Sequence, residues 1–154
     1  MTRELAELLR VDRPSPQRPR DVQRRRLYRW ERQWWPAEPR PVLSLEACQA
    51  LVADIWQTEM AGRPGWRRPP EVRDGRRRRS ACANRYWIKL PRWSRFPHLI
   101  VHELAHSLFL ESERHGPVFV GRVLHLLARY CGLDHDQLWH SAVNAGLKVK
   151  LYRR

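Results

Sequence analysis

Apolar residues recur at intervals of three and four along five segments of the chain, which is the period of amphipathic α-helices. Residues that suit helix ends flank these segments: Asp21, Ser44, Ser94 and Asp134 are expected N-caps, and Gly132 is an expected C-terminal stop. The pattern therefore predicts helices over residues 21–35, 45–61, 95–110, 117–131 and 135–145.

Between residues 66 and 91 the pattern is that of strands and turns. Arg85–Leu90 alternates between two faces and is the clearest strand in the chain. Before it, Glu71–Arg73 leads into Asp74-Gly75, a pair typical of hairpin turns. Residues 147–152 are expected to add a short terminal strand. The chain is thus expected to be mostly helical with a small sheet.

The first 20 residues differ from the rest of the chain. Residues 13–20 are rich in proline and arginine and cannot contribute to a core, so residues 1–20 are predicted to be a flexible lead-in. The full chain of 154 residues has the size of one ordinary domain. We therefore expect a single domain over residues 21–154.

The predicted helix over 95–110 contains His102-Glu103-Leu104-Ala105-His106, the H-E-x-x-H signature of zinc hydrolases. Histidines at i and i+4 project from one helical face and can share an ion. Glu103 lies where a general base would reach a zinc-bound water. Apolar residues surround the motif, which predicts a buried helix on which ionisable side chains need a shared partner.

A hydrolytic zinc site needs a third protein ligand and an open position for water. We choose His115, because it precedes the helix start at Gly116-Pro117, where the chain turns back toward the motif. His135, between two aspartates, is the second choice. Four further residues are weaker candidates, two as expected solvated carboxylates and two as expected structural histidines: Glu111, Glu113, His125 and His140.

The chain is strongly basic, with 30 lysines and arginines against 16 acidic residues and a formal net charge of +14. A nucleic acid is therefore a candidate partner. The run Arg76, Arg77, Arg78 and Arg79 is the candidate contact, and a solvated loop is the simpler alternative. Arg24–Arg26 are expected on the solvent side of the first helix.

The three cysteines, Cys48, Cys82 and Cys131, are widely spaced and form no C-x-x-C pair, so they are expected to be reduced thiols. No apolar run has the length of a signal peptide core or a membrane span. These features predict a cytoplasmic protein without a membrane partner.

A family resemblance follows from these residues. The order His102-x-x-x-His106, then His115-Gly116-Pro117-x-Phe119, resembles the SprT-like zincin peptidases. The segment 20–24, Tyr28, Glu31, the segments 44–46 and 90–93, and the metal motif resemble a family of small metallohydrolases of phages and bacteria. The resemblance covers about residues 20–150. It implies an α+β fold, a compact zincin-like metallopeptidase domain with a small β-sheet next to the motif helix.

The expected function is that of a cytoplasmic zinc metallopeptidase acting on a protein or peptide substrate. Glu103 would take a proton from the zinc-bound water and pass it to the leaving amine. The strand Arg85–Leu90 would offer its edge to an extended peptide. Asn84, Arg85 and Tyr130 are alternative oxyanion stabilisers, among which the sequence does not choose.

Two other functions remain open at this stage. One is a basic nucleic-acid-binding protein with a structural or inactive zinc site. The other is a metal-dependent amidase that acts on a substrate other than protein.

Overall fold

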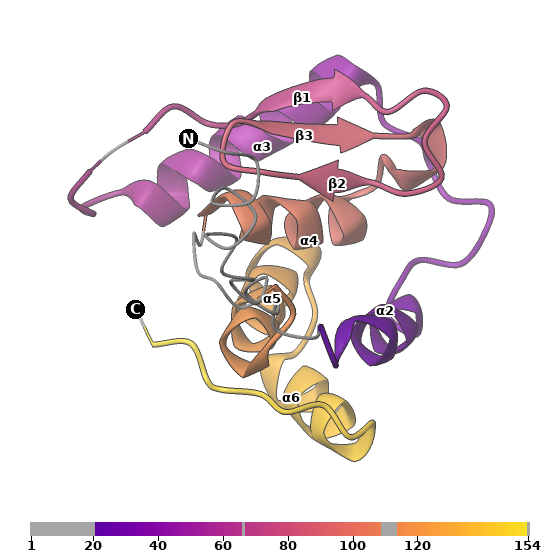
Figure 1. Ribbon diagram of the computed structural model, residues 1–154, viewed down its shortest axis with the longest axis vertical. Coiled ribbons are helices and arrows are strands. Elements are labelled where there is room, and N and C mark those ends of the chain that lie inside the picture. Colours follow the sequence, from indigo (N-terminus) through magenta and orange to yellow (C-terminus); the bar gives the residue numbers. More distant parts are fainter. Residues whose placement is uncertain (1–20, 66, 109–113, 154) are drawn as a thin grey trace, which may run out of the picture.

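The computed structural model describes residues 21–65, 67–108 and 114–153, and the predicted lead-in over residues 1–20 lies outside them. Within these ranges the chain has an α+β fold, in which five α-helices accompany one small sheet (Figure 1). The helices are α2 (Arg24–Arg32), α3 (Leu45–Met60), α4 (Pro97–Leu108), α5 (Pro117–Cys131) and α6 (His135–Asn144).

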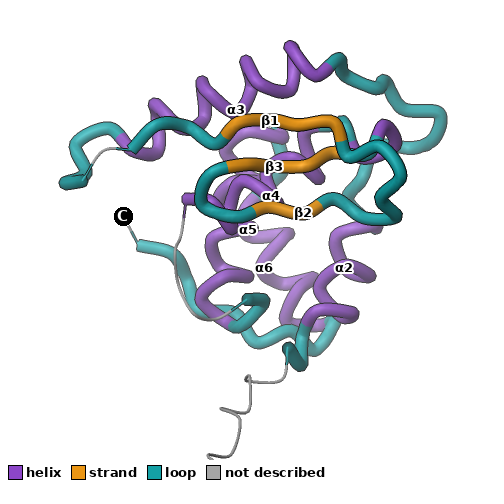
Figure 2. The backbone as a smooth tube through the Cα atoms, turned by 45° about the horizontal axis from the view of Figure 1, so that its top comes forward, coloured by secondary structure: helices purple, strands orange, loops and turns teal. Residues whose placement is uncertain are grey.

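The sheet has three strands in the order β1-β3-β2. They are β1 (Glu71–Asp74), β2 (Cys82–Ala83) and β3 (Trp87–Leu90). β1 is parallel to β3, and β2 is antiparallel to it. The sheet packs against α3 and α4, and Figure 2 shows it in front of α4.

The hairpin predicted at Asp74-Gly75 is wrong, because β1 pairs with β3 instead of with the segment that follows it. The backbone N–H of Gly75 donates to the Leu90 carbonyl at 3.0 Å and extends the ladder with β3. A Cβ atom at position 75 would lie 2.4 Å from the Pro91 nitrogen. Glycine is required here for the close approach of two backbones.

The clearest predicted strand, Arg85–Leu90, contains β3, which is the central strand. Both edges of β3 are therefore paired, and the expectation that this strand offers its edge to a peptide is wrong. The free edge on the side of α4 belongs to β2, against which α4 packs. Ile88 and Leu90 are fully buried against the helices.

Several predicted helix ends are confirmed. The Ser44 side chain accepts from the Ala47 N–H and caps α3, and Asp134 accepts from the Gln137 N–H and caps α6. Helix α5 begins at Pro117 and ends before Gly132, whose φ of 68° is the left-handed conformation that glycine adopts easily.

Other predicted ends are wrong. Helix α2 begins at Arg24 with Gln23 as N-cap, so Asp21 is free for another role. Ser94 lies in the 3-10 helix η1 (Arg92–Ser94), where its hydroxyl donates to the Pro91 carbonyl, and α4 begins at Pro97. The predicted strand over 147–152 is not formed; this segment crosses α5, with the Lys150 N–H bonded to the Pro117 carbonyl.

Helix α4 is the central element of the fold. It packs against α3, α5, β2 and β3, and nine of its twelve residues are buried. Helix α2 lies beside α6, and the indole N–H of Trp30 on α2 donates to the hydroxyl of Ser141 on α6 at 2.8 Å. Within the described ranges, every helix is too short or too polar to span a bilayer. The fold thus places the H-E-x-x-H motif in its middle layer.

Candidate metal centre

Three histidines that are separated in sequence meet at one point. His102 and His106 project from α4, and His115 lies two residues before α5. Each offers a ring nitrogen, and the three nitrogens lie within 4.8 Å of one another. His102 and His115 are buried, and His106 is half-buried. The structure thus brings together the three residues predicted as ligands, in an arrangement that can hold a metal ion.

In two of these rings the hydrogen bonds use Nδ1 and leave Nε2 of each ring for an ion. His102 Nδ1 lies 2.8 Å from both carboxylate oxygens of Glu31, and His115 Nδ1 lies 2.6 Å from Asp21 Oδ2. An ionised carboxylate only accepts hydrogen bonds, so each Nδ1 carries a proton, and Nε2 is the nitrogen of each ring that can bind an ion. Both Nε2 atoms are buried without a hydrogen-bond partner in the described part of the chain. The donor set therefore fits a metal ion.

Sequence reasoning assigned no role in the site to Glu31 or Asp21. Asp21 was expected to cap a helix, and Glu31 appeared only as part of a resemblance. One signal was present: Glu31 follows Trp30 on the apolar side of α2, where both residues are buried. A carboxylate at a buried helical position needs a partner.

A buried amide holds His115 in place. The Gln23 side chain donates to the carbonyl of His115 at 3.1 Å and to that of Lys148 at 3.2 Å. Its oxygen accepts from the Lys148 N–H at 2.7 Å. Gln23 thereby connects the start of α2, the His115 backbone and the C-terminal segment. The Phe119 ring, from the predicted His-Gly-Pro-x-Phe pattern, stacks on His106 at 4.3 Å between centroids.

Burial and charge keep two of the histidines neutral. Burial, together with the neighbouring His102 and His115 rings, lowers the pKa of His106 to about 2. Burial and positive charge at His102 also lower the pKa of His115. At His102, burial opposes protonation, but the Glu31 carboxylate outweighs it and raises the pKa. Neutral imidazole is the form that binds metals.

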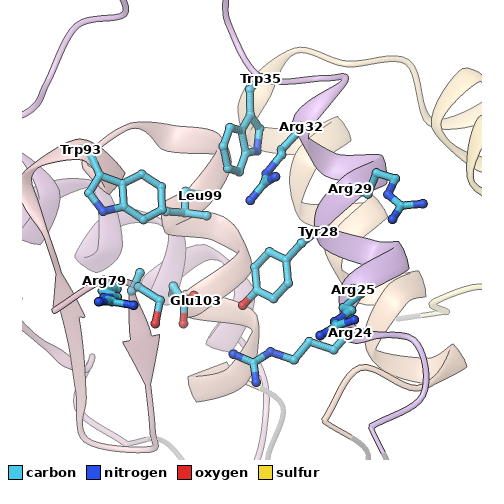
Figure 3. Close-up of a pocket in the computed structure, with 12 residues that line it drawn as sticks. Arg24, Arg25, Tyr28, Arg29, Arg32, Trp35, Arg79, Trp93, Leu99 and Glu103 are labelled. Atoms are coloured by element: carbon cyan, nitrogen blue, oxygen red, sulfur yellow. The ribbon is translucent and has the colours of Figure 1, made fainter.

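Glu103 lies beside the histidines on α4 and is 2 % exposed. Burial above all, and then the charge of Glu31, raises the pKa of its carboxyl group. Glu103 lines a pocket with Tyr28, whose ring points from α2 toward it (Figure 3). The carboxyl group thus has access to whatever enters the pocket.

Tyr28 also lies at the site, although in the sequence it appeared only as part of a family resemblance and was given no role. Its ring stacks on His102, with centroids 4.8 Å apart and an interplanar angle of 27°. Burial, and then the negative charge of Glu103 and Glu31, raises the pKa of the phenol, so the hydroxyl keeps its proton. Tyr28 can therefore donate a hydrogen bond in the pocket.

The other candidates lie elsewhere. Tyr130 donates to Glu59 at 2.5 Å and His125 bonds the same carboxylate at 3.1 Å, in a cluster between α3 and α5. The Asn84 side chain accepts from the Tyr86 and Trp87 N–H groups and shapes the turn before β3. Arg85 and His140 are exposed, and His135 begins α6 outside the cluster of ligands. Glu111 and Glu113 lie outside the described residues.

The four arginines of the predicted nucleic-acid contact are all exposed in the loop between β1 and β2. Arg76 pairs with Asp74 at 3.4 Å. Only Arg79 of the four lines the pocket beside Glu103. Arg79 therefore lies at the candidate site, and the other three arginines are exposed in the loop outside the pocket.

No family model, curated protein or solved structure matches the chain.

Proposed function

We propose that this protein is a zinc-dependent metallohydrolase with a zincin-like fold, and that it hydrolyses peptide bonds. One observation carries the proposal: two buried imidazole Nε2 atoms, which have no hydrogen-bond partner among the described residues, meet a third histidine, with the buried Glu103 beside them. A purely structural histidine cluster would leave those nitrogens unsatisfied at a cost. The resemblance of the His115-Gly116-Pro117-x-Phe119 pattern to SprT-like peptidases also supports this proposal.

The donor set favours zinc. Imidazole nitrogens suit zinc, copper, iron and nickel, and three protein ligands with a fourth open position are typical of catalytic zinc. His102, His106 and His115 would hold the ion. When bound, zinc supplies Lewis-acid chemistry, which polarises a carbonyl group and makes water a stronger nucleophile at neutral pH.

The protein's own groups have separate roles in this reaction. Glu103 accepts the proton of the attacking water and delivers it to the leaving amine. Tyr28 donates a hydrogen bond to the oxygen on which negative charge develops. Glu31 and Asp21 fix the ring orientation of His102 and His115 through their Nδ1 protons.

The free edge of the sheet supports a peptide as substrate. β2 is the edge strand that packs on α4, and Ser80 and Ala81, which precede it, line the pocket together with Glu103. An extended peptide lying along β2 would form main-chain hydrogen bonds and pass Glu103. Because β2 is only two residues long, side-chain contacts in the pocket must contribute to binding.

The second candidate is a nucleic-acid-binding protein with a structural zinc ion, which the exposed residues Arg76, Arg77 and Arg78 favour. This function would explain the basic loop. It does not explain a carboxyl group that is both buried and in contact with a pocket, as Glu103 is.

The experiment compares zinc content and hydrolysis for three proteins: wild type, Glu103→Gln and Tyr28→Phe. All three should retain one zinc per chain, because neither residue is a ligand. With a proteome-derived peptide library as substrate, we expect Glu103→Gln to lose about 10²-fold or more in rate. Tyr28→Phe should lower kcat by about 10²-fold with little change in KM.

Glu46→Gln, at an exposed position in the first turn of α3, is the matched control and should retain wild-type activity. A zinc-loaded wild type that cleaves no peptide in the library would overturn the peptidase function. Full activity in Glu103→Gln would overturn the mechanism while leaving the metal site intact.

A further inference from the structure

A basic pocket of about 520 Å³ lies beside Glu103. One wall is formed by α2 and the residues that follow it, and the other by the segment before β2, η1 and α4 (Figure 3). Five arginines line it: Arg24, Arg25, Arg29, Arg32 and Arg79. Among the described residues that line it, Glu103 is the only acidic one. The pocket therefore carries a large excess of positive charge next to the proposed reaction centre.

No carboxylate of the described residues pairs with these five arginines. Arginines elsewhere do, such as Arg95 with Asp74 at 3.0 Å and Arg129 with Glu59 at 3.2 Å. The pocket's arginines thus remain available for an anionic ligand.

Helical geometry groups the arginines of α2 on one side of the helix. Arg25 and Arg29 are four residues apart, and Arg24 and Arg32 are separated by eight, so these side chains share one side of the helix. The buried residues Leu27 and Trp30 face the other way, into the core. Arg79 lies on the opposite wall (Figure 3). A ligand in the pocket would be approached by guanidinium groups from both sides.

We infer that this pocket is a substrate subsite that selects peptides with aspartate or glutamate side chains near the bond to be cleaved. The inference rests on the proposed peptidase function and names its substrate class. Guanidinium groups pair with carboxylates through two parallel hydrogen bonds. Trp35 and Trp93 add apolar surface to the lining, against which the rest of a peptide can pack.

The geometry favours an acidic peptide over a nucleic acid. The unpaired arginines surround a concave site of limited volume that contains the proposed general base. A nucleic-acid surface instead follows a phosphate backbone along an extended groove or stripe. An oligonucleotide seated in this pocket would also exclude the peptide from Glu103.

The test measures binding directly and needs no turnover. The probes are a fluorescent ten-residue peptide with four glutamates, the same peptide with four glutamines, and a single-stranded DNA pentamer of similar charge. They are titrated against the zinc-loaded and metal-free full-length chain. We expect the glutamate peptide to bind about tenfold more tightly than the glutamine peptide in 0.05 M salt, because several modest ion pairs act together.

The variant Arg25→Glu/Arg29→Glu should abolish this preference without loss of zinc. Both residues are exposed on α2 and neither belongs to the core. The matched control, Arg68→Glu/Arg153→Glu, changes the net charge equally at exposed positions outside the pocket and should keep the preference. Raising the salt to 0.5 M should weaken the preference of the wild-type protein for the glutamate peptide.

Two outcomes would overturn the inference: equal affinity for the glutamate and glutamine peptides, or tighter binding of the DNA that depends on Arg25 and Arg29. Either can occur whether or not the protein cleaves peptides. Conversely, selective binding of the glutamate peptide by a zinc-loaded protein that cleaves nothing would support the pocket and overturn the proposed peptidase function.

Discussion

At the scale of single residues, two carboxylates decide what the histidines can do. Glu31 and Asp21 bond the Nδ1 atoms of His102 and His115 and turn both Nε2 atoms toward one point. Without these partners each ring could rotate or adopt the other tautomer, and the shared point would lose its donors. Glu31 and Asp21 therefore help to set the orientation of the two rings at the candidate metal centre.

Replacing Glu31 by glutamine should weaken zinc binding by about 10-fold to 100-fold. Glutamine is close in size and keeps an acceptor oxygen, but it lacks the charge that makes the His102 ring a better donor. Competition with a chelator of known affinity measures the change. Glu71→Gln, at an exposed position of β1, is the control and should bind zinc as tightly as wild type. Equal affinities in the two variants would contradict a role for Glu31 at the metal centre.

At the scale of elements, the motif helix α4 owes its position to its neighbours. It packs against α3 on one side and α5 on another, and a buried ionic cluster joins α3 to α5. In that cluster Glu59 of α3 is fully buried and bonds His125, Arg129 and Tyr130 of α5. Its contacts hold the two helices that flank the site.

The Glu59→Gln variant should be less stable by about 2–3 kcal/mol, because it breaks a buried hydrogen-bonded ion cluster. Burial opposes ionisation of Glu59, but hydrogen bonds from His125 and Tyr130 outweigh it and lower its pKa to about 2. A carboxyl group with a lowered pKa stabilises the fold above its unfolded pKa of about 4.3 and loses this contribution as pH falls toward 2.

Urea unfolding of metal-free protein at pH 7 and pH 3 measures this effect, and the metal-free state removes any contribution from zinc release. The difference between wild type and Glu59→Gln should shrink at the lower pH. Glu46→Gln, in the exposed first turn of the same helix, should change stability by only a few tenths of a kcal/mol. An unchanged difference at both pH values would show that the cluster does not depend on the charge of Glu59.

At the scale of the whole molecule, the site joins four separate parts of the chain. Asp21 precedes α2, Glu31 lies on it, His102 and His106 come from α4, and His115 precedes α5. Gln23 connects the same region to the C-terminal segment through Lys148. An ion at this junction would stabilise the arrangement of all of these elements.

Removing zinc should therefore lower the melting temperature. Zinc at 100 times its Kd stabilises a protein by about 2.7 kcal/mol, which is a shift of roughly 5–10 °C for a domain of this size. Differential scanning calorimetry with and without a chelator measures the shift. The His115→Ala variant should show no such response. A full zinc response in this variant would point to another third ligand, with Glu113 and His135 as the next residues to test.

The local patterns of the chain were sufficient to predict much of this structure. Helical periodicity and end residues predicted the five helices, and Ser44, Gly132 and Asp134 function as expected, because capping depends on neighbouring backbone atoms. The H-E-x-x-H spacing predicted that His102 and His106 share a face, and the turn before α5 indicated His115. The shared face of His102 and His106 is a short-range property that a helix imposes by itself.

Tertiary structure alone decided which residues surround those ligands. No periodicity reveals that Asp21 pairs with a ring 94 residues away, or that Glu31 pairs with one 71 residues away. The Asp74-Gly75 pair predicted a hairpin, but β1 pairs in parallel with β3 instead. Parallel strands are joined by a long crossover connection, so their pairing depends on tertiary packing and not on the residues that directly follow a strand. The arginines expected on the solvent side of α2 line the proposed substrate pocket. Helical periodicity predicts which residues form the exposed face of a helix, but only tertiary packing determines which other elements lie opposite that face.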